Sequence, residues 1–120
     1  MATQVTVRRS FSFLQTATAL QTLTIFLQAV SAGLLLSTPY GEALHSAGAR
    51  VMYGASMLCV LAAVLAWKPG GGSPRPVLYA SGLLALASLQ VVLGIAHVPS
   101  VHLPLGVLMF GLSVLGLVRR

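Results

Sequence analysis

Charged residues are scarce in this sequence, and their scarcity determines the class of protein. Only 7% of the 120 residues are charged, whereas 57% are hydrophobic. Soluble domains contain about 25% charged residues, so the composition predicts a membrane protein whose partner is the lipid bilayer. The net charge of +6 does not indicate nucleic acid, because the basic residues are scattered and are not interleaved with aromatic residues on one face.

Acidic residues are scarcer still, since Glu42 is the only one in the chain. A di-iron carboxylate centre needs several acids and is therefore excluded. A small multidrug-type exporter needs an acid in its first span to couple protons, and the first apolar run here has none. The three histidines and Glu42 lack the usual spacings of a zinc site. The single cysteine, Cys59, cannot close a disulfide within the chain, and we expect a buried, inert thiol.

Four long apolar runs make up most of what is present. They cover about residues 11–36, 43–67, 77–97 and 101–118, and about 20 apolar residues are enough to cross a bilayer. Segments rich in proline and glycine separate the later runs. We predict a single all-α domain over residues 1–120, a membrane-embedded four-helix bundle with up-down-up-down topology.

The first run has two interpretations. Its basic start and the small residues near its end are also typical of a cleavable signal peptide. Its length and its glutamines favour a retained helix instead. Gln21 and Gln28 are seven residues apart and so share a helix face, and we expect them to hydrogen-bond to other helices of the bundle.

The basic residues predict the orientation in the membrane. If four helices alternate in direction, six of the seven basic residues fall on one side. By the positive-inside rule, both termini are then cytoplasmic, here in a bacterial plasma membrane. Arg50 is the exception, and we expect it either to snorkel outward or to meet an anionic group held near His45. The six residues are Arg8, Arg9, Lys68, Arg75, Arg119 and Arg120.

The histidines gather at the opposite end. His45 begins the second run, His97 ends the third and His102 begins the fourth. In a four-helix bundle the second and fourth helices lie diagonally across the core, and His45 and His102 are at matching depth. Gly48 and Gly106, one turn further on, leave room beside each ring. This pattern predicts a slot for a flat macrocycle with iron ligated from both sides; the alternative is a set of histidines at the membrane interface.

Three segments resemble the haem A synthase family over about residues 41–112. Glu42-Ala43-Leu44-His45 is similar to the start of that family's second helix. Gln90-Val91-Val92-Leu93-Gly94 and His102-Leu103-Pro104-Leu105-Gly106 are similar to its third and fourth helices. The resemblance implies that His45 and His102 are axial ligands of haem b, with haem O or haem A as substrate or product. It also implies that Glu42 is a carboxylate near the haem edge, where it takes part in oxidising a haem methyl group.

The chain departs from the family in several ways. It has one bundle where the usual enzyme has two, it lacks the family's cysteine pair, and Ser46 follows the first histidine where an arginine is frequent. His97 matches no ligand of the family. We therefore expect a haem-binding membrane protein that acts as a haem-modifying oxidoreductase or as an electron carrier, assembled as a homo-oligomer or with a membrane redox partner. The alternatives are a small scaffold or accessory subunit, or an exporter, without haem; Glu42 is then only a helix-capping acid.

Overall fold

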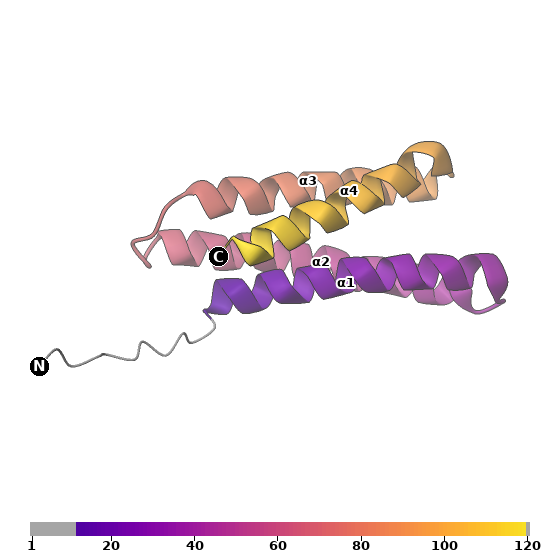
Figure 1. Cartoon of the computed structure of the whole chain (residues 1–120), viewed down its shortest axis with the longest axis horizontal. Coiled ribbons are helices and arrows are strands. Elements are labelled where there is room, and N and C mark those ends of the chain that lie inside the picture. The colour runs from indigo at the N-terminus through magenta and orange to yellow at the C-terminus, as the bar shows by residue number, and fades with distance from the viewer. Residues whose placement is uncertain (1–11, 120) are drawn as a thin grey trace, which may run out of the picture.

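The computed structural model describes residues 12–119, and within them all regular structure is α-helical. The helices are α1 (Phe13–Ser37), α2 (Gly41–Trp67), α3 (Arg75–Ile95) and α4 (Pro99–Val118) (Figure 1). Each is long and apolar enough to cross a membrane, so the protein is a multi-pass membrane protein. The predicted all-α fold with four apolar helices is confirmed. The expected start of the first helix at Phe11, the arginines at 8 and 9, and Arg120 lie outside the described residues.

The helix boundaries follow from local chemistry. Ser12 caps α1, since its hydroxyl accepts from the Gln15 N–H at 3.1 Å while the Gln15 side chain accepts from the Ser12 N–H at 2.9 Å, a capping box. Residues 75–76 and 99–100 were expected in turns but belong to α3 and α4. The reason is that proline at the first helical positions needs no N–H partner and already has a helical φ; Pro76 and Pro99 occupy such positions.

The expected end of the third helix, at about His97, lies two residues beyond the observed end of α3 at Ile95. His97 has a φ of 53°, the left-handed conformation. Its N–H donates to the Gly94 carbonyl at 3.2 Å, and the Val98 N–H donates to the Leu93 carbonyl at 3.0 Å. These two bonds form a Schellman motif, which satisfies carbonyls that the helix end would leave without partners.

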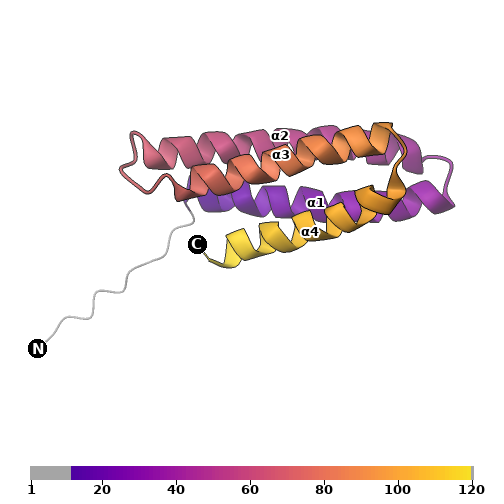
Figure 2. The ribbon, with the colours of Figure 1, turned by 90° about the horizontal axis from the view of Figure 1, so that it is seen from above.

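Successive helices run in opposite directions. The α1–α2 turn and the α3–α4 turn lie at one end, and the α2–α3 loop and the end of α4 lie at the other (Figures 1 and 2). We call these the histidine end (turns 38–40 and 96–98) and the loop end (loop 68–74). Each helix packs against its neighbours in sequence, and α1 also packs against α4. The helices α2 and α4 therefore lie on a diagonal of the bundle, as do α1 and α3.

Two apolar clusters form the interior from the loop end to the middle. Small side chains dominate the first, which holds Ala17, Cys59, Ala62, Ala63 and Ala80. The second, in the middle, holds Ile25, Met52, Ala87 and Met109. Small residues let helix backbones approach closely, which is the main source of packing between helices in a membrane. The prediction of a buried Cys59 is confirmed.

The glutamines of α1 bond to α2, as predicted. Gln21 Nε2 donates to Ser56 Oγ at 3.0 Å, and Gln28 Nε2 donates to the backbone carbonyl of His45 at 3.1 Å. Both Gln21 and Ser56 are almost completely buried. An amide that faces a bundle interior needs such a partner, because lipid offers none.

Candidate functional site

The imidazole rings of His45 and His102 lie together at the histidine end. Their centroids are 6.3 Å apart and their planes are nearly perpendicular, at 80°. Each ring comes from the first two turns of its helix, α2 or α4, and each residue is half-buried. Because α2 and α4 are diagonal, the two rings meet across the interior of the bundle, as their matching positions in the sequence predict.

Both rings are anchored through Nδ1. His102 Nδ1 lies 3.0 Å from the backbone carbonyl of Gln90. A carbonyl oxygen only accepts hydrogen bonds, so Nδ1–H of His102 is the donor and its Nε2 keeps the lone pair. His45 Nδ1 lies 2.9 Å from Ser31 Oγ. With each Nδ1 engaged, Nε2 is the nitrogen that each ring has available for a ligand.

The spacing of the rings suits one metal ion held between them. Metal–imidazole bonds are about 2.0–2.1 Å long for zinc, and two such bonds in line place the ring centroids about 6 Å apart. The observed centroid separation of 6.3 Å is of this size, and the two rings meet edge to face. Anchoring of the second ring nitrogen is also typical of metal-ligating histidines, since it fixes the tautomer and the ring orientation.

Two glutamine side chains lie beside the histidines. A β-carbon at Gly48 would lie 2.2 Å from Gln28 Oε1, and one at Gly106 would lie 3.1 Å from Gln90 Nε2. The space that we expected to form a slot for a macrocycle thus holds the ends of two flexible amide side chains in this structure. A third glycine, Gly94, lies against the His102 ring itself. A β-carbon built at Gly94 would lie 3.3 Å from Cε1 of that ring.

Every helix contributes to this cluster: Gln28 and Ser31 come from α1, His45 from α2, Gln90 from α3 and His102 from α4. Within residues 12–119, Gln90 Oε1 is the one buried side-chain nitrogen or oxygen that lacks a hydrogen-bond partner. Buried polar atoms without partners are rare and costly, and they often indicate a ligand or water. The imidazole pair and this acceptor are the groups at the histidine end that a ligand could contact.

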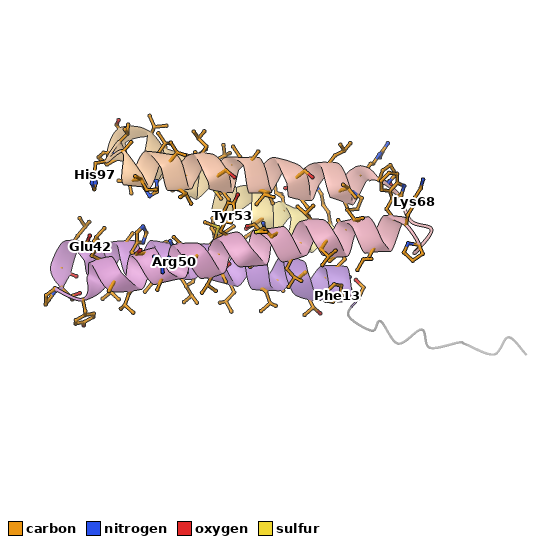
Figure 3. The ribbon with its side chains drawn as sticks, turned by 180° about the vertical axis from the view of Figure 1, so that it is seen from behind. Phe13, Glu42, Arg50, Tyr53, Lys68 and His97 are labelled. Atoms are coloured by element: carbon orange, nitrogen blue, oxygen red, sulfur yellow. The ribbon has the colours of Figure 1, made fainter. Side chains whose placement is uncertain are left out.

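The other predicted site residues lie apart from the rings. Glu42 is exposed in the first turn of α2, one turn from His45 toward the histidine end. His97 is exposed at the same end of the bundle (Figure 3). Arg50 is exposed too, and five residues turn a helix by about 140° relative to His45. The structure therefore brings His45 and His102 together and leaves Arg50 on another face of α2.

An internal repeat relates the two halves of the site, and the sequence analysis missed it. The order His, Met, aromatic residue, Gly and Ser recurs at identical intervals in α2 and α4, and the motif Leu-Gln-x-Val occurs in both α1 and α3. Both methionines lie in the middle cluster and both serines are fully buried. A comparison of the chain with itself would have found this signal. The paired residues are His45 and His102, Met52 and Met109, Tyr53 and Phe110, Gly54 and Gly111, Ser56 and Ser113, and Gln28 and Gln90.

Comparisons with known proteins do not assign the chain to a family. No family model, no curated protein and no solved structure matches the chain. Among residues 12–119, no group of three or more His, Cys, Asp or Glu side chains is placed to hold a metal ion.

Proposed function

We propose that this protein binds one haem b between His45 and His102, with one imidazole on each face of the iron. The observation that carries the proposal is the 6.3 Å ring spacing across the bundle, together with the hydrogen bond at each Nδ1. A haem bound there would supply one-electron redox chemistry, tuned by its two axial ligands and by the polarity around them.

The internal repeat supports equal roles for the two histidines. Each half of the chain places a histidine near the start of its second helix and a glutamine on the preceding helix. Two equivalent ligands of one iron explain why both halves keep this arrangement. His97 offers the contrast, because it is an exposed histidine in a turn and has no counterpart in the repeat.

The resemblance to one half of haem A synthase extends the proposal to a haem-modifying oxidoreductase with haem O or haem A as substrate or product. Glu42 is then the carboxylate at the haem edge, which its place one turn from His45 supports. We also propose a bacterial plasma membrane with both termini cytoplasmic, since Lys68, Arg75 and Arg119 lie at the loop end and basic residues favour the cytoplasmic side. A homo-oligomer is supported by Gly54, Gly82 and Gly111, because a β-carbon built at each of them would meet no atom of another helix within 4 Å, so that a helix of a second copy can approach there.

An optical spectrum tests haem binding directly. Protein purified in detergent after haem b supply should show a Soret band that His45→Ala and His102→Ala both abolish. The matched control is His97→Asn, which removes the third histidine and tolerates the left-handed backbone. A wild-type protein without the band, or a band that persists in both alanine variants, would overturn the proposal.

Analysis of the extracted pigment tests the enzymatic part. In cells that also make haem O, a haem-modifying enzyme should yield pigment with an oxidised methyl group, and Glu42→Gln should return unmodified haem while the Soret band remains. Unmodified haem in the wild type under the same supply would show a carrier rather than an enzyme.

A further inference from the structure

Ser31 connects α1 to the histidine pair. It is buried, with only 8% of its surface exposed, and its Oγ lies 2.9 Å from His45 Nδ1. The same hydroxyl lies 3.1 Å from the Gln28 backbone carbonyl and 3.3 Å from Gln28 Oε1. Ser31 therefore has three polar atoms within reach and one proton to give.

The chemistry of these three atoms decides where the proton goes. Both Gln28 oxygens can only accept, whereas His45 Nδ1 can either donate or accept. If the Ser31 hydroxyl donates its one proton to Gln28 Oε1, its oxygen is free to accept from Nδ1–H of His45, and the amide oxygen, the hydroxyl and the ring nitrogen all have partners. The Gln28 backbone carbonyl does not depend on this proton, because it lies inside α1 and accepts from the helix backbone. If it donates to Nδ1 instead, the amide oxygen of Gln28 loses this donor inside the bundle, which is costly.

Gln28 is itself held in place. Its Nε2 donates to the His45 backbone carbonyl at 3.1 Å, and its Oε1 lies over Gly48, where a β-carbon would come within 2.2 Å. The amide thus spans from the backbone of His45 to the hydroxyl that faces the His45 ring. Glycine at position 48 is what allows this side chain to lie there.

We propose that Ser31, supported by Gln28, is a positioning residue that holds His45 in the tautomer with Nδ1 protonated and with the lone pair on Nε2. The benefit for iron ligation rests on the proposed haem site, but the tautomer itself does not. His102 reaches the same state through a backbone carbonyl, which no substitution removes. The two ligands are therefore anchored differently, and a change at Ser31 affects one of them alone.

The tautomer is measurable without haem. Long-range ¹H–¹⁵N correlation spectra of histidine-labelled, haem-free protein in detergent should show Nδ1–H for His45 and His102 in the wild type, with signals assigned through His97→Asn and His102→Ala. In Ser31→Ala, His45 should shift toward the Nε2–H form while His102 stays unchanged, and Ser31→Thr, which keeps the hydroxyl, should restore the wild-type pattern. An Nε2–H form of His45 in the wild type, or an unchanged His45 in Ser31→Ala, would overturn the proposal.

Haem titration adds the functional consequence. Loss of an anchoring partner of a ligating histidine lowers affinity about 10–100-fold, so Ser31→Ala should bind haem b that much more weakly and Ser31→Thr should recover. Ser37→Ala is the matched control on the same helix, because Ser37 is exposed and its hydroxyl bonds only to the Gly33 carbonyl. If wild-type protein takes up no haem, the proposed function fails, and the tautomer spectrum still decides the role of Ser31.

Discussion

The two ends of this bundle differ in the side chains that fill their interior. At the loop end, the apolar cluster consists of four alanines and one cysteine, and Ala63 has none of its surface exposed; Thr18, next to Ala17 in α1, is buried there as well. At the histidine end, beyond the methionines of the middle cluster, the interior consists of two histidines, two glutamines and Ser31. The same four helices thus bring backbones close together at one end and bring polar side chains together at the other.

This difference is the reason that we place the proposed function at the histidine end. Close packing of small residues holds helices together in lipid without any polar contribution. Polar side chains inside a membrane protein are expensive unless they are paired, and they mark functional positions. The loop end explains why the bundle is stable, whereas the histidine end has a polar cluster that packing alone does not require.

The largest effect is expected from removing a histidine. His45→Ala or His102→Ala should abolish the Soret band and leave the helix content of far-UV circular dichroism unchanged, because the packing at the loop end does not involve either ring. Loss of helix content together with the band would show that the two ends are not independent.

A larger residue at the loop end should lower the stability of the fold and leave the haem spectrum unchanged. Ala63→Leu adds three carbons in a fully buried position, and overpacking costs about 1–3 kcal/mol. Thermal or denaturant unfolding in detergent should show this loss, while the haem spectrum of the folded fraction stays that of the wild type. Ala29→Leu, on the exposed side of α1, serves as the control and should unfold like the wild type.

A smaller effect is expected at the buried amide between the two ends. Gln21→Leu removes the bond to Ser56, and hydrogen bonds between transmembrane helices are worth about 0.6 kcal/mol on average, with a maximum near 1.7. The measured free energy of unfolding should fall by about that amount. A fall of several kcal/mol would mean that Gln21 belongs to a larger polar network.

Effects of similar size are expected from the glycines, and they differ between the faces of the helices. Gly54 has no other residue within 4 Å of a built β-carbon, so Gly54→Ala should stabilise monomeric protein by about 0.5–1 kcal/mol. Gly48→Ala should lack this gain because Gln28 must move away from its bond to His45. Paired unfolding measurements compare the two variants, and equal stabilisation would contradict the described position of Gln28.

Part of the site was predictable from the sequence, and part was not. The depth of His45 and His102 follows from counting residues after each turn, and the helix boundaries agree with the predicted ones to within two residues. The hydrogen-bond partners of the two rings could not be predicted from the sequence. Ser31 and the backbone carbonyl of Gln90 had no signal of their own in the sequence, because both contacts join different helices.

The sequence by itself determined the class of protein, the number of spans and the level at which the histidines lie, because hydropathy and the rise per residue depend only on local composition. Only the tertiary structure decided that the two rings meet edge to face, that Gln28 and Gln90 fill the space beside the glycines, and that His97 stays outside. The physical reason is rotation about each helix axis: helices that are apolar on every side carry little information about which face turns inward. Packing against the other three helices supplies that information.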